Sequence, residues 1–314
     1  MKKEMVFSGR GLAVAHKVVL AVALVTMMVA AGCGKVDKQA GKGGCGSQVG
    51  TVERDTIEGV PCCVYVPYQY EKRAAETVFP VLYLQHGMFG SEDDWTGQGR
   101  LVAIMDSLLR CGKVAEMVVI MPDNFLGSMP PAERQELMAA LDITLDGQAI
   151  DTSKGSAHWR KLTYEQERGY EMSGYWESHF AAFMAAAEAR YSISREASGR
   201  AIAGLSMGGF HTMHVSHHLH GQFAYAGLFS AVIHPYAPAA LYEAWEEEVR
   251  AQMACGALYW IGMGREDFLY DQLQDYRRWL EANHLEYTYY ESTGGHTWDN
   301  WQDYISRFLP KLFR

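Results

Sequence analysis

Residues 200–209 read RAIAGLSMGG, and this stretch decides the fold. The apolar run 201–205 predicts a buried strand, and the pattern over 207–220 predicts a helix. Ser206 therefore stands at a strand-to-helix turn, which presents a hydroxyl above the carboxyl edge of a sheet. The two glycines of the G-x-S-x-G pattern allow strand and helix to approach where a β-carbon would clash. Because so short a pattern does not establish a nucleophile, the rest of the chain must supply its partners.

Short apolar runs alternate with helical patterns along residues 49–314. The runs lie at 62–66, 79–85, 117–121, 201–205, 224–229, 257–261 and 285–290, and the helical patterns near 99–111, 174–190, 207–220, 238–252, 270–283 and 299–312. Most runs are continuous, as expected of strands that are covered on both faces. The segments 49–57 and 60–66, separated only by Glu58 and Gly59, predict an antiparallel hairpin. The whole pattern predicts an α/β fold, with a doubly wound, mostly parallel sheet and helices on both faces.

Residues 1–32 have the composition of an export signal. Four basic residues precede an uncharged run of fourteen residues, Val18–Ala31, which is shorter than a membrane-spanning helix. The run leads into Ala30-Ala31-Gly32-Cys33, which resembles the lipobox of bacterial lipoproteins, where the cysteine is lipidated. We therefore expect export and a lipid anchor at Cys33, on a membrane of the bacterial cell envelope facing the periplasm or the cell surface. An ordinary cleaved signal or an N-terminal anchor is the alternative.

The remaining chain divides into a tether and a folded part. Residues 33–48 are glycine-rich without apolar periodicity, and such a chain has a root-mean-square reach of about 20 Å. Residues 49–314 suit a single large α/β domain. Within it, the segment 124–172 breaks the alternation and predicts an insertion. Long insertions are usually functional loops, although a surface excursion without function is the alternative.

The charge and the cysteine content argue against a nucleic-acid-binding protein and against a protein held together by a full set of disulfides. The net charge is −9, and residues 1–32 hold four of the 28 basic and one of the 37 acidic residues. The rest therefore carries 24 bases and 36 acids, a net charge of −12, which argues against nucleic-acid binding. Besides Cys33, an odd number of cysteines without a C-x-x-C pair argues against a full disulfide framework. These are Cys45, Cys62, Cys63, Cys111 and Cys255.

A serine hydroxyl attacks an ester at neutral pH only with a general base and an acid that orients the base. His296, in the glycine-rich STGGHTW (292–298), is the one histidine of twelve in a flexible loop after a late strand. Asp267 ends GMGRED (262–267), directly after the run 257–261, with Glu266 as the neighbouring alternative. The chain order serine, aspartate, histidine is that of α/β-hydrolases.

An oxyanion hole needs two preorganised backbone donors. One candidate is the N–H of Met207, directly after the serine, where the positive end of a helix favours negative charge. The second belongs to QHGMFG (85–90), after the run 79–85, and we assign it to Met88 with Gly87 as the alternative. Because neither these donors nor the three side chains need a metal or an organic cofactor, we expect none.

Other polar residues have both a functional and a packing interpretation. Candidates to contact a substrate are His86, Trp298, Asp123 and Asn124. His86 could equally serve only in a turn, and Trp298 could only anchor the last helix. The histidines of HTMHVSHHLH (211–220) include three on one helical face, His211, His214 and His218. Because the sequence places no carboxylate near them, we expect packing rather than metal binding.

Four motifs together resemble the esterase D-type family of α/β-hydrolases. They are RAIAGLSMGGFHTMH, LQHGMFGSEDDW, GREDFLYDQ and GGHTWDNWQDY, and the resemblance runs from about residue 50 to the end of the chain. The family includes S-formylglutathione hydrolases and mycolyltransferases. The motifs are most similar to carbohydrate esterase family 1, which holds feruloyl and acetylxylan esterases. The resemblance implies an α/β-hydrolase fold and a Ser-His-Asp acyl-enzyme mechanism with Ser206, His296 and Asp267.

The resemblance and the export signal together imply an exported serine esterase. Its expected substrates are feruloyl or acetyl esters on plant polysaccharides or oligosaccharides. An acyltransferase to a sugar or lipid acceptor and a thioesterase like S-formylglutathione hydrolase are the enzymatic alternatives. A catalytically inactive binding lipoprotein is the alternative from another class, and it should have lost Ser206, Asp267 or His296. The sequence does not predict the oligomeric state.

Overall fold

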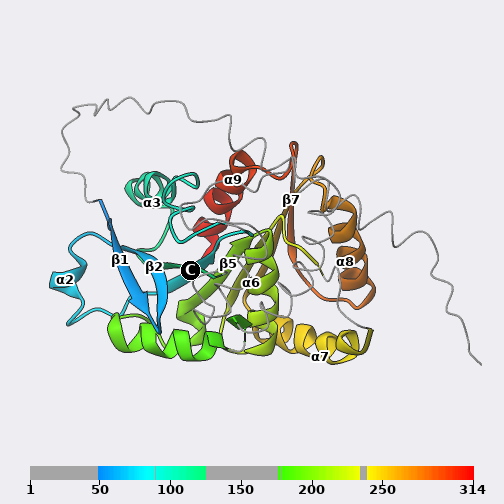
Figure 1. Cartoon of the computed structure of the whole chain (residues 1–314), viewed down its shortest axis with the longest axis horizontal. Coiled ribbons are helices and arrows are strands. Elements are labelled where there is room, and N and C mark those ends of the chain that lie inside the picture. Colours follow the sequence, from blue (N-terminus) through cyan, green and yellow to red (C-terminus); the bar gives the residue numbers. More distant parts are fainter. Residues whose placement is uncertain (1–48, 89, 125–175, 178, 234–238) are drawn as a thin grey trace, which may run out of the picture. The chain divides into compact units, whose positions relative to one another are not determined.

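The structure is a computed structural model that describes residues 49–88, 90–124, 176–177, 179–233 and 239–314. Within this part of the chain one eight-stranded sheet has the order β1-β2-β4-β3-β5-β6-β7-β8 (Figure 1). The strands are β1 (Thr51–Ile57), β2 (Val60–Val66), β3 (Val81–Gln85), β4 (Val118–Pro122), β5 (Arg200–Leu205), β6 (Tyr225–Phe229), β7 (Leu258–Gly264) and β8 (Thr288–Ser292). β2 pairs antiparallel with β1 and β4, and every other pair is parallel. The predicted hairpin and the mostly parallel α/β sheet are confirmed.

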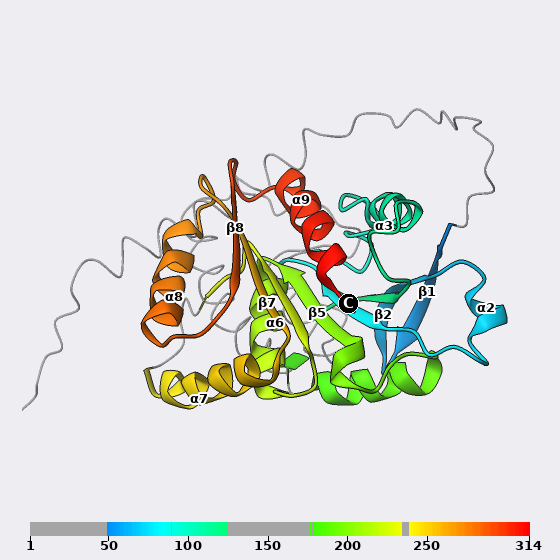
Figure 2. The ribbon, with the colours of Figure 1, turned by 180° about the vertical axis from the view of Figure 1, so that it is seen from behind.

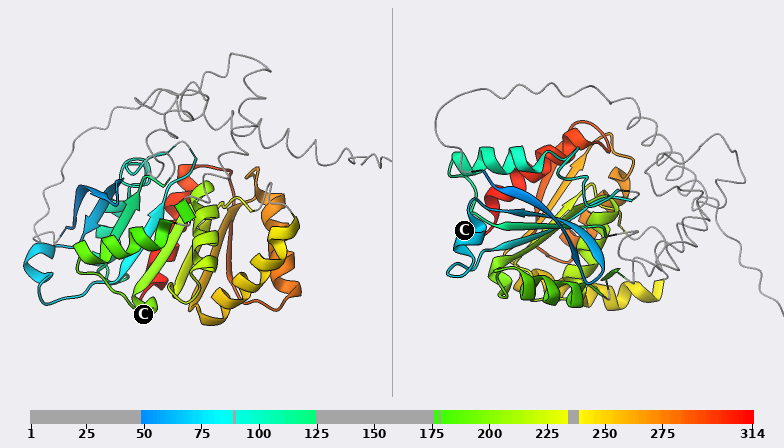
Figure 3. Two further views of the ribbon diagram at one scale, coloured as in Figure 1. Left: turned by 60° about the horizontal axis from the view of Figure 1, so that its bottom comes forward. Right: turned by 60° about the vertical axis from the view of Figure 1, so that its left-hand side comes forward.

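Helices cover both faces of this sheet. They are α2 (Tyr70–Arg73), α3 (Leu101–Arg110), α6 (Met207–His218), α7 (Ala239–Cys255), α8 (Tyr270–Ala282), α9 (Trp298–Phe308) and a helix over 179–190. Side chains of α3 and α9 share one buried cluster, and those of α6, α8 and 179–190 share the other. Figures 2 and 3 show α3 and α9 together on one side of the sheet. This arrangement is the doubly wound fold that the sequence predicts.

The continuous apolar strands follow from this double cover. In β3, Leu82 and Leu84 belong to the cluster under α3 and α9, whereas Val81 and Tyr83 belong to the opposite cluster. Successive side chains of a strand point to opposite faces, so both must be apolar when both faces are buried.

Two strand boundaries differ from the prediction by three residues. β8 begins at Thr288 rather than 285, because Leu285 and Tyr287 pack against the core before the chain reaches the position beside β7. β7 extends to Gly264 rather than 261, since Gly262 to Gly264 pair with β8. The loops after β7 and β8 therefore begin later along the chain than the apolar runs suggest.

Several predicted segments lie outside the described residues: the export signal, the lipidation site at Cys33, the tether and nearly all of the insertion 124–172. Within the described part of the chain, no helix combines the length and the apolar character needed to span a membrane.

Candidate active site

Ser206 occupies a strained turn between β5 and α6. Its backbone has φ 53° and ψ −116°, a conformation that non-glycine residues rarely adopt. Two backbone hydrogen bonds hold the turn: Ser206 N donates to Phe229 O at 2.9 Å, and Val232 N donates to Ser206 O at 3.2 Å. The segment after β6 thus fixes the serine at the carboxyl edge of the sheet.

A buried carboxylate lies against the candidate base. His296 Nδ1 is 2.9 Å from Asp267 Oδ2 and 3.1 Å from Oδ1, and Leu269 N donates to Oδ1 at 2.9 Å. An ionised carboxylate only accepts hydrogen bonds, so Nδ1 carries the proton and Nε2 is left with a free lone pair. Of the two acids left open by the sequence, Asp267 is 4% exposed and contacts the imidazole, whereas Glu266 is exposed.

The loops that carry these two residues are bonded to each other. Glu266 N donates to Gly294 O at 3.2 Å, and Arg265 N donates to Ser292 O at 3.0 Å. Asp267 N donates to Gly264 O at 3.1 Å, which turns the chain directly after β7. β8 lies three strands from β5 in the sheet, a distance of about 14 Å at ordinary strand spacing. A residue that follows β8, such as His296, can therefore approach Ser206 only through a loop.

Aromatic rings hold the imidazole of His296 in place. The ring of Phe268 lies 4.6 Å from it between centroids, and Trp301 packs edge-on at 4.9 Å. Trp298 is half-buried and packs edge-on against Trp95 at 5.4 Å and Trp301 at 5.1 Å. Trp298 thus anchors α9 in the described structure, and a contact with substrate stays a prediction.

The loop after β3 runs close beside Ser206. A β-carbon on Gly87 would lie 3.4 Å from Ser206 Cβ, so the backbone of this loop lies beside the serine. Gly90 N donates to Gly87 O at 3.1 Å, which closes a turn that contains Met88. Met207 is the first residue of α6, and the first N–H groups of a helix have no acceptor within it. Both candidate oxyanion donors therefore belong to elements that meet at Ser206.

Three of the residues predicted to contact a substrate contact one another, and their contact with a substrate stays a prediction. His86 is 1% exposed, its Nδ1 lies 2.7 Å from Gly87 O, and Asn124 N donates to its Nε2 at 3.1 Å. His86 N donates to Asn124 Oδ1 at 2.9 Å, and Asn124 Nδ2 donates to His86 O at 3.2 Å. Asp123 Oδ1 is 3.4 Å from His86 Nε2. These contacts fasten the loop after β3 to the end of β4.

A family model matches residues 133–312, and its description is "Putative esterase". This chain belongs to the esterase family. Its fold is that of the α/β-hydrolases.

Proteins similar to this chain include feruloyl esterases. Over 60 residues it is 43% identical to an endo-1,4-beta-xylanase/feruloyl esterase of Xylanibacter ruminicola, a match that spans 18% of this chain and 8% of that protein. The ferulic acid esterase of the anaerobic fungus Anaeromyces mucronatus is 20% identical, with a TM-score of 0.64 over 87% of this chain and 94% of its own. S-formylglutathione hydrolase of Staphylococcus aureus is 18% identical, with a TM-score of 0.55 over 87% of this chain and all of its own. The solved structures show a shared fold.

The expectation that no carboxylate lies near the histidines of α6 was wrong. Glu177 Oε1 is 3.7 Å from His211 Nδ1, and Glu177 Oε2 is 3.9 Å from His214 Nδ1. Glu177 comes from the helical segment packed against α6, 34 residues earlier in the chain than His211, so no local pattern reveals the contact. Burial raises the pKa of Glu177 and lowers that of His211 to about 3, so burial disfavours the charged form of each and His211 is neutral at pH 7. Among the described residues, no three His, Cys, Asp or Glu side chains are grouped to hold a metal ion.

Three residues linked by hydrogen bonds were not among the predicted site residues: Gln85, Trp176 and Thr212. Gln85 ends β3, and its side chain bonds to Trp176 and Thr212. The signal in the sequence is a glutamine at the end of an otherwise apolar run, VLYLQ. Its partners cannot be read from the sequence, because they lie 91 and 127 residues away.

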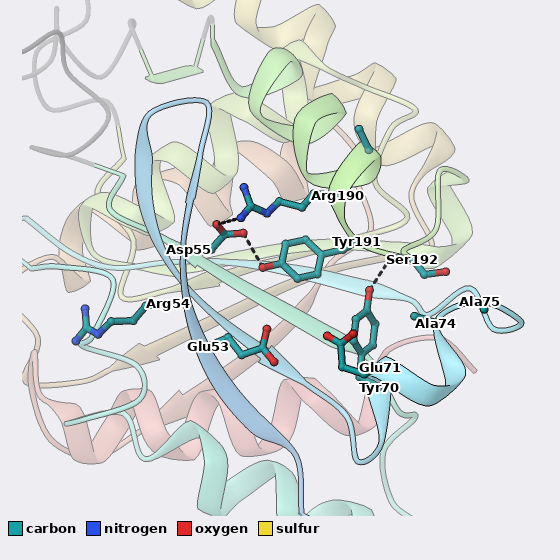
Figure 4. A pocket seen from close by; sticks show the side chains of 11 residues that line it. Glu53, Arg54, Asp55, Tyr70, Glu71, Ala74, Ala75, Arg190, Tyr191 and Ser192 are labelled. Atoms are coloured by element: carbon teal, nitrogen blue, oxygen red, sulfur yellow. Dashed lines mark hydrogen bonds and ion pairs between the residues drawn. The ribbon is translucent and has the colours of Figure 1, made fainter.

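A cleft of about 620 Å³ lies away from these residues, at the β1 edge of the sheet (Figure 4). Its charged side chains are partly paired among themselves: Asp55 bonds Arg190 at 2.6 Å and accepts from Tyr191 Oη at 2.7 Å. Tyr70 Oη, also on its wall, accepts from Ser192 N at 2.7 Å. The cleft shares no residue with the pair Asp267–His296, and we do not assign the ester chemistry to it.

We expect the buried imidazole of His211 to make this esterase less stable in acid. Burial lowers its pKa from the ordinary 6.5 to about 3. As the pH falls below 6.5 the unfolded chain binds this proton and the folded chain does not, so stability is lost from pH 6.5 down toward pH 3. Between pH 7 and 4.5 this group alone should remove about 2–3 kcal/mol. His211→Gln should lose less unfolding free energy than the wild type over that range, measured by urea titration.

His218→Gln is the matched control, because its side chain lies on the same helix and is 63% exposed. It should retain the wild-type dependence on pH. Glu177 acts in the opposite direction, since an acid with a raised pKa loses stability as the pH rises above its ordinary value near 4.5. Equal pH dependence in the wild type and in His211→Gln would contradict the assignment of a neutral buried His211.

Proposed function

We propose that Ser206 is the nucleophile of this esterase, His296 its general base and Asp267 the acid that orients the base. The observation that carries the proposal is the buried Asp267 carboxylate within 2.9 Å of His296 Nδ1, in loops that follow β7 and β8. That bond directs Nε2 outward as the acceptor. The strained turn at Ser206 lies at the same edge of the same sheet, where α/β-hydrolases carry their nucleophile.

The proposed reaction passes through an acyl-enzyme. Ser206 Oγ attacks the ester carbonyl carbon while His296 Nε2 accepts the hydroxyl proton. The tetrahedral intermediate then collapses, and the imidazolium returns the proton to the leaving alcohol. A water molecule, deprotonated by the same nitrogen, attacks the acyl-serine and releases the carboxylic acid. Asp267 stays ionised throughout and stabilises the imidazolium.

The oxyanion of both tetrahedral intermediates would lie between two backbone donors. We assign these to the N–H of Met207 and the N–H of Met88, with Gly87 as the alternative to Met88. The proximity of the Gly87 backbone to Ser206 Cβ supports a position beside the reacting carbonyl. Donors fixed in place before reaction contribute most to such catalysis, and the loss of one typically costs about 10²–10³ in rate.

For the substrate we propose feruloyl or acetyl esters on plant polysaccharides or their oligosaccharides. The proposal is supported by the local identity to a xylanase/feruloyl esterase and by the shared fold with a ferulic acid esterase. Of the residues that we expected to contact the substrate, Trp298 is half-buried beside the His296 loop. A planar aromatic surface there suits a hydroxycinnamoyl ring or a sugar face.

We also propose that residues 1–32 direct export, that 33–48 tether the protein and that 49–314 form one catalytic domain with an insertion at 124–172. The lipid anchor at Cys33 is directly testable. In bacteria that process lipoproteins, the wild type should sediment with membranes, and Cys33→Ser should appear in the soluble fraction with its esterase activity intact. Unchanged sedimentation of Cys33→Ser would contradict the anchor.

Substitution of two of the three proposed residues should abolish hydrolysis without unfolding the protein. We expect Ser206→Ala to lower kcat by at least about 10⁴-fold, because it removes the nucleophile. Asp267→Asn should lower kcat by about 10³–10⁴-fold with KM nearly unchanged, because an amide can hold the wrong tautomer of His296. Release of ferulate from methyl ferulate measures both.

Glu266→Gln, next to Asp267 but exposed, is the control and should retain activity. Methyl ferulate, acetylated xylan and S-formylglutathione, compared side by side, separate the proposed substrates from the thioester alternative. Acyl products that form only with an added sugar or lipid acceptor would indicate an acyltransferase. Full activity of Ser206→Ala would contradict the mechanism, and an inert wild type would favour the binding lipoprotein.

A further inference from the structure

A polar side chain is buried directly behind the candidate oxyanion loop. Gln85 is the last residue of β3, it is fully buried, and it immediately precedes His86 and Gly87. In the sheet it is paired with Gly204, the first glycine of the G-x-S-x-G motif. A buried amide is costly unless its donor and acceptor are both bonded, so its partners indicate what it holds.

The amide of Gln85 joins two other elements. Its Oε1 accepts a hydrogen bond from Trp176 Nε1 at 2.7 Å, and its Nε2 donates to Thr212 Oγ1 at 3.3 Å. Thr212 Oγ1 in turn donates to Gly208 O at 2.8 Å, in the first turn of α6. The result is a continuous buried chain of hydrogen bonds from Trp176 through β3 to the residue two positions after Ser206.

A second contact ties the backbone of Gln85. Trp95 Nε1 donates to Gln85 O at 3.0 Å, from the loop between β3 and α3. Trp95 also packs edge-on against Trp298 near the His296 loop. The end of β3 is therefore held by side chains from three directions: Trp176, Thr212 and Trp95.

The distance between β3 and α6 decides the geometry of the oxyanion hole. One proposed donor, Met207 N, belongs to α6, and the other belongs to the loop that continues β3. The two elements are in backbone contact here, since a β-carbon on Gly208 would lie 2.7 Å from Gln85 O. A shift of β3 along α6 would move one donor away from the other, and misplacement by about 1 Å can cost about 10²-fold in rate.

We propose that Gln85 is a positioning residue for the oxyanion hole, which it holds in register by bridging Trp176 and Thr212 across β3 and α6. The proposal rests on the function proposed above for Ser206 and its backbone donors. Gln85 itself does not contact the ester. Its side chain points into the protein, and its effect on the reaction passes through the backbone of the residues that follow it.

A positioning role differs from a role in stability alone by what it does to the transition state. An oxyanion hole stabilises the tetrahedral intermediate and hardly affects the binding of the planar ester. Loss of the bridge should therefore lower kcat and leave KM within about twofold. A trifluoromethyl ketone forms a hemiketal with the serine whose oxyanion occupies the hole, so its affinity should fall with kcat.

The test uses the whole chain with Gln85→Met, which keeps the size of the side chain and removes both hydrogen bonds. We expect kcat for methyl ferulate to fall about 10–100-fold. Affinity for an aryl trifluoromethyl ketone should fall by a similar factor, while the affinity for ferulate, the product, stays unchanged. Thr212→Val and Trp176→Phe, which each remove one of the two hydrogen bonds of the Gln85 amide, should give smaller losses in the same two quantities.

Ser216→Ala is the matched control for Thr212→Val. Ser216 is also buried on α6 and donates to a backbone carbonyl, Met213 O at 3.0 Å, without a bond to β3. It should lose stability without loss of kcat or ketone affinity. If Gln85→Met fails to fold, the two single-bond variants decide the question by the same measurements.

Wild-type kcat and ketone affinity in a folded Gln85→Met protein would overturn the proposal, as would a fall in kcat with unchanged ketone affinity. Failure of the proposed function would be distinguishable, because hydrolysis would then survive in Ser206→Ala. The proposal about Gln85 fails on its own if activity requires Ser206 and is indifferent to Gln85.

Discussion

The close contact between the first turn of α6 and the end of β3 is the constraint on which the site depends. The two backbones touch because Gly208 carries no side chain. The backbone of Gly87, in the loop after β3, lies beside Ser206. This contact sets the strained turn of Ser206 beside the loop to which we assign the second oxyanion donor. The sheet makes the contact possible, since the paired residues Gln85 and Gly204 end β3 and β5 side by side.

The candidate acid Asp267 and the candidate base His296 lie in two other loops, after β7 and β8. The loops after β7 and β8 are bonded to each other, and the buried Asp267 carboxylate contacts Leu269 N and His296 Nδ1. Burial of a charged group is costly unless hydrogen bonds compensate for the lost water, and these two contacts supply such bonds. The rings of Phe268 and Trp301 restrict the imidazole further. Contacts within the protein therefore hold both halves of the candidate site.

The fold and the candidate triad follow from local patterns, and the supporting residues do not. The apolar runs predict the parallel sheet because strands covered on both faces must be apolar throughout. Ser206, Asp267 and His296 each follow a strand within a few residues, so their chain order predicts them. The bridge from Gln85 to Trp176 and Thr212, and the contact between Glu177 and His211, depend on how helices far apart in the sequence pack. The periodicity of apolar residues in the sequence does not show which side chains meet when such distant helices pack together.

The proposed mechanism requires a covalent bond between the acyl group and Ser206. A fluorophosphonate phosphonylates an activated serine irreversibly, so the most direct measurement is the mass and position of its adduct after complete inactivation. We expect one adduct per chain, on the tryptic peptide that contains Ser206, and loss of activity in proportion to its formation. An adduct on another residue, or an enzyme that remains active with Ser206 fully modified, would contradict this mechanism.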